Sequence, residues 1–179
     1  MERTVRYLAI TFFATILLQG CGKDLSLQRY FVENQENENF ITQDFPLSMV
    51  GIDTSNFTEE QIQAYNSVNK LNFLGYKVNK NHIADYHAEV EKVKAILGHS
   101  KYNSLIEFND KGNKVVVKYI GDDHEADEVV VFGYSKQMGF GIVRVLGHDM
   151  NPEKMATLIG AVQKTDINTN KVNHIIDFF

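Results

Sequence analysis

Residues 128–146 read EVVVFGYSKQMGFGIVRVL, and this stretch decides the fold. Two runs rich in β-branched and aromatic residues, 128–134 and 139–146, stand on either side of the segment 135–138. Strand-forming runs separated by a few turn residues are typical of a β-hairpin. The stretch therefore predicts two antiparallel strands joined by a tight turn.

Two more strands are predicted just before this hairpin, at 102–108 and 113–120. The four residues between them, Asn-Asp-Lys-Gly, favour a turn. The acidic stretch 121–127 connects the second of these strands to the hairpin. Successive strands with short connections pair as antiparallel neighbours, so we expect a four-stranded meander.

The turn at 135–138 is expected to pair Phe132 with Gly141 across the hairpin. This pairing would place Glu128 and Arg144 on opposite faces of the sheet, because side chains alternate along a strand. Both faces would carry mostly apolar side chains. We therefore expect the sheet either to be covered on both faces or to offer a partly apolar surface to a partner or ligand.

Helices are predicted on both sides of these strands in the sequence. Apolar residues at helical spacing indicate a short helix over 27–32 and a longer amphipathic helix over 83–97. Residues 58–61, Thr-Glu-Glu-Gln, form a capping box that predicts the start of another helix. Asn151 followed by Pro152 predicts the start of the last one.

Two strands are predicted in the N-terminal half, at 45–52 and at 71–78. Pro46 would place the first of them at a sheet edge or at a strand start. Together the elements predict an α+β fold. It would consist of a mainly antiparallel sheet that contains the C-terminal-half four-stranded meander, packed with about three to four helices. The apolar tail 172–179 is expected to dock on this domain.

The N-terminal residues have the layout of an export signal, in which two arginines precede the apolar run 7–18. This run is too short to cross a bilayer, which takes roughly 20 apolar residues as a helix. The residues Leu18-Gln19-Gly20-Cys21 resemble a bacterial lipobox. The resemblance implies cleavage between Gly20 and Cys21 and attachment of acyl chains to Cys21.

On this interpretation residues 1–20 are a lipoprotein signal peptide that is removed, 21–26 are the lipidated cysteine and a short tether, and 27–179 form a single α+β domain. Several acyl chains together anchor a protein stably. Gly22 follows the cysteine, where an Asp favours inner-membrane retention in some bacteria. We therefore expect a cell-envelope protein that is anchored in the outer membrane and faces the periplasm.

Cysteine content, net charge and missing motifs argue against several classes of function. Cys21 is the only cysteine, so the domain has no disulfide and its stability must come from its core. The net charge of −5 argues against nucleic-acid binding, which requires a basic surface. The sequence contains neither a Gly-x-Ser-x-Gly elbow nor an HExxH pair. We therefore assign no catalytic residue, no metal ligand and no cofactor.

The acidic stretch 122–128 contains the main candidate for a cation site. Asp122, Asp123 and His124 bring two carboxylates and an imidazole together, and Ca²⁺ and Mg²⁺ prefer oxygen ligands. The stretch lacks the glycine and the ligand spacing of an EF-hand loop. A solvated connection between two strands explains it more simply.

Arg144 is the other binding candidate, because it lies among apolar residues of the last meander strand. A buried arginine needs a carboxylate or carbonyl partner. An ion pair with Asp149 or Asp127 is one interpretation, and an anion-binding role is the other.

Several segments resemble the domain-of-unknown-function 4252 (DUF4252) family: Leu27–Val32, Tyr102–Asn109, Val115–Gly121, Gly139–Gly147 and Asp149–Pro152. The resemblance runs across almost all of the chain after residue 20. It implies a small exported protein of two-membrane bacteria with one α+β domain. It implies no activity, cofactor or catalytic residue.

These observations favour a lipid-anchored envelope protein that binds another envelope component or supports the envelope, without catalysis. Its partners would be the membrane, through the acyl groups on Cys21, and an envelope protein, while the oligomeric state stays open. Two alternatives remain. One is a metal-dependent or acid/base enzyme that uses the loop Asp122 to Glu128, and the other is a carrier of an apolar ligand that uses the two-faced sheet.

Overall fold

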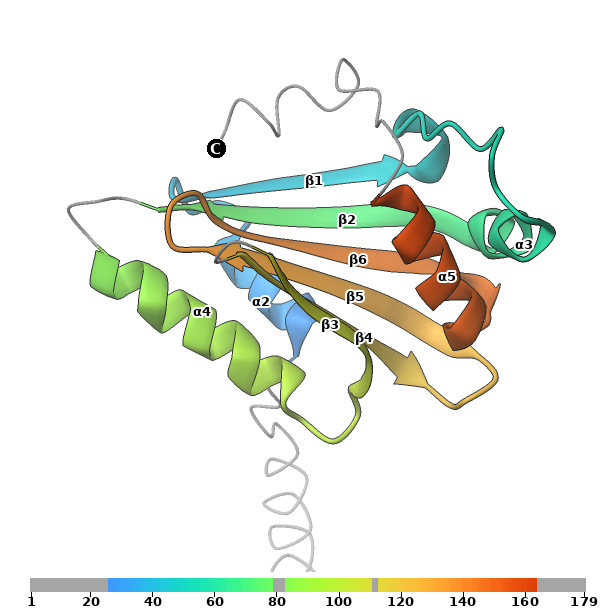
Figure 1. The fold of residues 1–179 in the computed structure, drawn as a ribbon. Coiled ribbons are helices and arrows are strands. Elements are labelled where there is room, and N and C mark those ends of the chain that lie inside the picture. Colours follow the sequence, from blue (N-terminus) through green and yellow to red (C-terminus); the bar gives the residue numbers. More distant parts are fainter. Residues whose placement is uncertain (1–25, 79–82, 111–112, 164–179) are drawn as a thin grey trace, which may run out of the picture.

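The computed structural model describes residues 26–78, 83–110 and 113–163 (Figure 1). The predicted export signal, Cys21 with most of its tether, and the tail 172–179 lie outside the described residues.

The described elements are helices and strands that alternate irregularly along the chain. The helices are α2 (Leu27–Asn34), α3 (Glu59–Ser67), α4 (Ile83–Leu97) and α5 (Pro152–Val162), with a short 3-10 helix η2 (Leu47–Met49). The strands are β1 (Phe40–Pro46), β2 (Val68–Lys77), β3 (Asn103–Asp110), β4 (Asn113–Gly121), β5 (Ala126–Ser135) and β6 (Gly139–Met150).

The strands form one six-stranded sheet in the order β1-β2-β6-β5-β4-β3 (Figure 1). Every neighbouring pair is antiparallel. The predicted meander is confirmed, since β3, β4, β5 and β6 follow one another both in sequence and in the sheet. The N-terminal hairpin β1-β2 joins the meander through β2, which pairs with β6. The fold is therefore α+β with an antiparallel sheet, as the sequence predicted.

The predicted strand over 45–52 is wrong. The strand β1 ends at Pro46, and the next residues form η2. A proline has no N–H to continue a ladder, which suits the last residue of an edge strand. The alternation of apolar residues beyond Pro46 does not mark one buried face of a strand, because Leu47 is buried while Met49 is 58% exposed.

The predicted pairing of the β5-β6 hairpin is also wrong, by one residue. Phe132 lies opposite Ile142, and Gly133 lies opposite Gly141. The loop has three residues between the paired Ser135 and Gly139, a common hairpin length. Because a slip of one residue turns every side chain to the other face, Glu128 and Arg144 share a face instead of lying on opposite ones.

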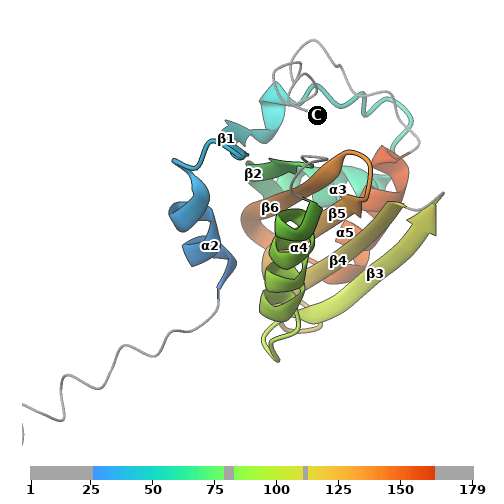
Figure 2. The same cartoon turned by 90° about the vertical axis from the view of Figure 1, so that its left-hand side faces the viewer.

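Helices α2 and α4 cover one face of the sheet, called here the α2 face (Figure 2). The helices contribute the buried side chains of Leu27, Tyr30, Phe31, Tyr86, Val90, Val93, Ile96 and Leu97. The sheet contributes Leu74, Tyr76, Val130, Phe132, Phe140 and Ile142. The amphipathic pattern of 83–97 is confirmed except at Ile83, which is 42% exposed.

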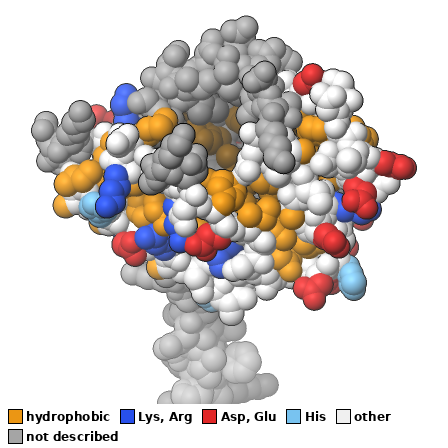
Figure 3. All heavy atoms as spheres, viewed as in Figure 1, with side chains coloured by type: hydrophobic (Ala, Val, Ile, Leu, Met, Phe, Trp, Pro, Cys, Tyr) orange, Lys and Arg blue, Asp and Glu red, His pale blue; other side chains and the backbone are white. Residues whose placement is uncertain are grey.

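Helices α3 and α5 pack near one end of the opposite face, called here the α5 face (Figure 1). The buried cluster there contains Ala64, Leu71, Val117, Val129, Val145, Met150, Met155 and Leu158. Toward the other end, Val115, Val131 and Val143 are only half-buried. Figure 3 shows hydrophobic side chains on the surface beside α5. Both faces are thus apolar, as predicted, and the described helices cover them unequally.

The predicted helix starts are confirmed by their caps. The backbone N–H of Thr58 donates to the Gln61 side chain at 2.9 Å, and the Thr58 hydroxyl accepts from the Gln61 N–H at 3.3 Å. The Asn151 side chain accepts from the Lys154 N–H at 3.0 Å, with Pro152 as the first helical residue. Each cap satisfies an otherwise unpaired N–H of the first turn.

Tyr30 joins the two helices of the α2 face, because its hydroxyl donates a hydrogen bond of 2.7 Å to Oε2 of Glu89 on α4. Burial, together with the hydrogen bond and negative charge of Glu89, raises the pKa of Tyr30 above its usual value near 10. A group whose pKa is raised in the folded state stabilises the fold below its unfolded-state pKa. That contribution is lost as the pH rises above this value.

We therefore predict that the free energy of unfolding falls as the pH rises above about 10, and that Tyr30→Phe makes this fall shallower because phenylalanine cannot ionise. The variant should also cost about 1 kcal/mol near neutral pH through the lost hydrogen bond. Urea denaturation from about pH 7 to about pH 11 measures both effects. Equal pH dependence in the two proteins would contradict the prediction.

Gly139 begins β6 at the point where the hairpin loop meets β2. Its φ angle is 127°, and a Cβ at this position would overlap the carbonyl oxygen of Tyr76. We predict that Gly139→Ala lowers the free energy of unfolding by about 2 kcal/mol or more, as measured by urea denaturation. Gly160→Ala is the control, because a Cβ there has no atom within 4 Å. The control should change stability by less than about 1 kcal/mol or raise it.

Candidate functional site: a polar groove beneath helix α2

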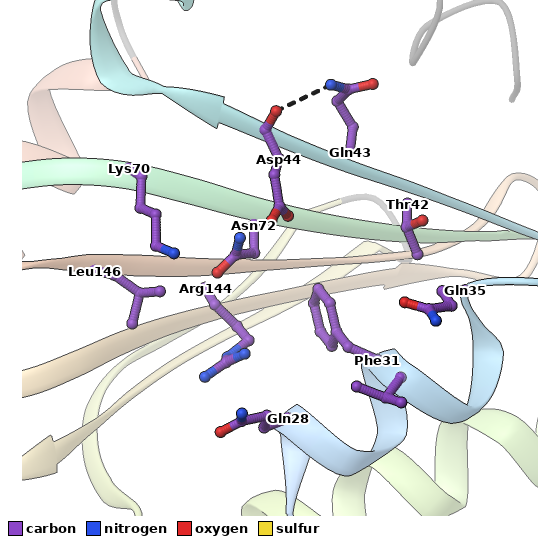
Figure 4. Close-up of a pocket in the computed structure, with 11 residues that line it drawn as sticks. Gln28, Phe31, Gln35, Thr42, Gln43, Asp44, Lys70, Asn72, Arg144 and Leu146 are labelled. Atoms are coloured by element: carbon purple, nitrogen blue, oxygen red, sulfur yellow. Dashed lines mark hydrogen bonds between the residues drawn. The ribbon is translucent and has the colours of Figure 1, made fainter.

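A polar groove of about 440 Å³ lies between α2 and the strands β1, β2 and β6 (Figure 4). The helix contributes Gln28, Phe31, Val32 and Gln35. The strands contribute Thr42, Gln43, Asp44, Lys70, Asn72, Arg144 and Leu146. Its size is within the range of small-molecule sites, and its lining combines amides, charges and a few apolar side chains.

Three polar residues form a row across the middle of the groove, one on each of three neighbouring strands. Asp44 of β1 pairs with Asn72 of β2, and Asn72 pairs with Arg144 of β6. Directly paired residues place their side chains on the same face, and neighbouring strands lie about 4.8 Å apart. Figure 4 shows the three side chains next to one another on the side of the sheet that faces α2.

Arg144 forms a bidentate ion pair with Glu128 of β5. Its Nε donates to Oε1 of Glu128 at 2.8 Å, and its Nη2 donates to Oε2 at 2.7 Å. The Arg144 and Glu128 side chains are only 12% and 11% exposed, and the Phe31 ring lies 5.5 Å from the guanidinium carbon. The hydrogen bonds to Glu128 raise the pKa of Arg144 above its usual value.

This geometry corrects the prediction that Arg144 pairs with Asp149 or Asp127. The partner is Glu128, which the one-residue error in hairpin register had placed on the opposite face. The two carboxylate oxygens of Glu128 already receive two guanidinium donors. An anion at Arg144 would therefore have to compete with a carboxylate that is part of the fold.

Asn72 is the unusual residue of the groove, because it is 6% exposed and yet its side-chain amide makes no hydrogen bond to any residue that the structure describes. Buried amides in proteins are almost always paired with protein groups or water. No side-chain atom of the described residues is completely buried without a partner, so the amide keeps access to the groove. The Asn72 amide is therefore open to water or to a ligand in the groove.

The acidic connection that includes Asp122, Asp123 and His124 is built as a turn between β4 and β5. Asp122 accepts hydrogen bonds from the backbone N–H groups of His124 and Glu125 at 2.8 and 2.9 Å, and these bonds lower its pKa. The Tyr119 hydroxyl donates to Asp123 at 3.2 Å. These contacts give two of the acidic side chains a role in holding the turn.

The side chain of Asn151 extends this arrangement, since its Nδ2 donates to the carbonyl of His124 at 3.2 Å. Within residues 26–78, 83–110 and 113–163, no group of three or more His, Cys, Asp or Glu side chains is placed to hold a metal ion. The loop predicted as a cation candidate is therefore a hydrogen-bonded connection tied to the start of α5.

A second, shallower hollow of about 240 Å³ lies near the β5-β6 loop. Its lining includes Val115, Gly133, Tyr134, Met138 and Gly141. It is smaller than typical sites for small molecules. In the described part of the chain, no helix has the length and apolar character needed to span a membrane.

Sequence reasoning singled out Arg144 but missed Glu128, Asp44, Lys70 and Asn72 as parts of one site. A polar residue inside the apolar run Leu71 to Leu74 was the available signal for Asn72, because a buried strand seldom carries an amide without a partner. The other three could not be placed without the strand pairing.

The buried ion pair generates a prediction about stability. Arg144→Met should lower the free energy of unfolding by about 3–5 kcal/mol, because it leaves the Glu128 carboxylate buried without its partner. The double variant Arg144→Met with Glu128→Met should lose much less, since no charge remains buried. Urea denaturation of the single and double variants measures the coupling.

Glu91→Gln is the matched control for the single and double variants at 128 and 144. Glu91 pairs with Lys94 at 2.8 Å on the exposed side of α4, where the Glu91 side chain is 71% exposed. It should change stability by less than about 1 kcal/mol, as exposed ion pairs usually do. Additive effects of the two changes at 128 and 144 would contradict a coupled pair.

Comparison with known proteins agrees with the resemblance described above. The family model for the domain of unknown function DUF4252 matches residues 30–158. No curated protein and no solved structure matched the chain. The matched range begins within α2, ends within α5 and contains all six strands of the sheet. Because the match covers well over half of the chain, this protein belongs to the DUF4252 family.

Proposed function

We propose that this protein is a lipid-anchored protein of the cell envelope whose domain binds another envelope component and catalyses no reaction. The stretch Leu18-Gln19-Gly20-Cys21 carries the proposal, because it resembles a lipobox and follows an apolar run of the length of a signal sequence. Acylation of Cys21 and of the new N-terminus would hold the protein on the membrane. Gly22 after the cysteine favours the outer membrane, with the domain facing the periplasm.

The start of the fold supports this arrangement. Helix α2 begins at Leu27 and is capped by Ser26, whose side chain accepts from the Arg29 N–H at 3.3 Å. Five residues, Gly22 to Ser26, therefore separate Cys21 from the first helical residue, and the six steps along the chain span at most about 20 Å. An acylated Cys21 would keep α2, and with it the groove that α2 lines, close to the membrane surface.

The groove supports a binding role for the domain. The Arg144 guanidinium in the groove is neutralised by Glu128. This neutralisation favours recognition through hydrogen bonds over charge-driven chemistry at that residue. Asn72 offers both a donor and an acceptor on the floor of the groove. These features are those of a recognition site, and they lie on strands beneath α2, the helix nearest to the proposed anchor.

The proposed anchor is tested with Cys21→Ala expressed from the full chain. The wild type should appear in the membrane fraction, incorporate labelled palmitate and show the mass of a triacylated chain that begins at residue 21. The variant should incorporate no label and should lose its membrane association.

Gln19→Ala is the matched control, because it changes the lipobox-like stretch at a position where a small residue is common. It should be acylated like the wild type. Wild-type protein of unmodified mass, or labelling that persists in Cys21→Ala, would overturn the anchor.

A further inference from the structure

We propose that the groove beneath α2 is a binding site for a neutral saccharide, with the Asn72 amide as its central hydrogen-bonding group. The inference rests on the binding role proposed above but does not depend on the lipid anchor. It follows from the burial of Asn72, from the charge balance of the groove and from the kinds of polar groups that line it.

Asn72 provides the first step, because the residue is only 6% exposed while its amide reaches the groove and makes no hydrogen bond to the residues that the structure describes. A ligand that displaces water from this amide must replace its hydrogen bonds, because an amide left without them is unfavourable. A ligand that both donates to the amide oxygen and accepts from the amide nitrogen would satisfy it. A pair of neighbouring hydroxyl groups does both, since each hydroxyl can donate and accept.

The charges around Asn72 provide the second step. Arg144 is neutralised by Glu128, and the remaining charges of the groove are one cation, Lys70, and one anion, Asp44. Neither Lys70 nor Asp44 makes a side-chain ion pair or hydrogen bond with the described residues. The groove therefore carries no net charge, with one carboxylate and one ammonium group beside the paired Arg144. A neutral ligand suits such a site, because it leaves no charge uncompensated.

The rest of the lining provides the third step. Gln28, Gln35 and Thr42 add amide and hydroxyl groups along the helix and along β1. Val32, which is 59% exposed, and Leu146 add apolar surface at the rim. A sugar ring combines hydroxyl edges with C–H faces, so it can use both kinds of surface at once. The volume of about 440 Å³ is within the range of small-molecule sites.

Other ligand classes fit the groove less well. An inorganic or organic anion would find no net positive charge in the groove, because Arg144 is paired with Glu128 and the charge of Lys70 is balanced by that of Asp44. A peptide strand that extends the described sheet would pair with one of its edge strands, β1 or β3. The groove instead lies over the face of β1, β2 and β6, on the side covered by α2.

The experiment is isothermal titration calorimetry on protein produced from the full chain and held in a detergent without a sugar headgroup. The soluble arm uses the neutral disaccharides maltose, cellobiose and di-N-acetylchitobiose. The membrane arm uses vesicles with and without a neutral monoglucosyl diacylglycerol. Glucuronic acid, inorganic phosphate and trialanine serve as the anionic and peptide probes.

We expect saturable binding of at least one neutral disaccharide or of the glycolipid vesicles, and the arm that binds identifies a soluble or a membrane source. Asn72→Ala should weaken this binding by roughly tenfold or more, which corresponds to loss of one or two hydrogen bonds. Asn109→Ala, which changes an exposed asparagine on the distant edge strand β3, should leave it unchanged. Binding should depend little on salt, because the ligand is neutral.

Asn72→Leu separates binding from folding. Because the Asn72 amide has no partner in the described chain, replacing it with an apolar side chain of similar size should preserve or raise thermal stability while binding is lost. The proposal is overturned if no neutral saccharide binds in either arm, if only the anionic or peptide probes bind, or if sugar binding survives both changes at Asn72. Failed acylation of Cys21 with intact sugar binding would overturn the anchor alone.

Discussion

The ion pair between Glu128 and Arg144 organises the α2 face of the sheet. Two charged side chains in neighbouring central strands can be buried there only because they satisfy each other through two hydrogen bonds. The pair in turn supports Phe31 of α2, whose ring lies over the guanidinium. Without mutual neutralisation, this part of the sheet could not lie beneath a helix.

Helix α2 depends on this face and on its polar links to the rest of the fold. Tyr30 connects it to Glu89 of α4, and the backbone N–H of Leu27 donates to the Tyr102 hydroxyl at 3.4 Å. Burial raises the pKa of Tyr102 above its usual value. The helix is thereby held at its first turn and along its inward side, and it leaves open the groove above β1, β2 and β6.

The residues with the most conspicuous chemistry in the sequence have structural roles, and less conspicuous ones line the groove. Asp122 and Asp123 hold a turn through hydrogen bonds. Asn72 and Asp44 lie in strands that read as ordinary parts of a sheet, yet the register places them beside Arg144. The type of a side chain was therefore a poorer guide to the site than the position of its residue in the paired strands.

The predictions that held were those supported by local signals. The cap at Thr58, the start at Asn151 and Pro152, and the stripe of α4 all arise from interactions between residues a few positions apart. The end of β1 at Pro46 and the loop length of the β5-β6 hairpin were misjudged, because alternating apolar residues fit more than one boundary or register.

The sequence by itself determined the types and order of most elements, the four-stranded meander, the apolar character of both sheet faces and the family. Only the tertiary structure decided that Glu128 is the partner of Arg144 and that Asp44 and Asn72 join them in one groove. The physical reason is that helix starts and turns are stabilised by near neighbours in the chain. Cross-strand neighbours are instead set by register, and one residue of difference moves a side chain from one face to the other.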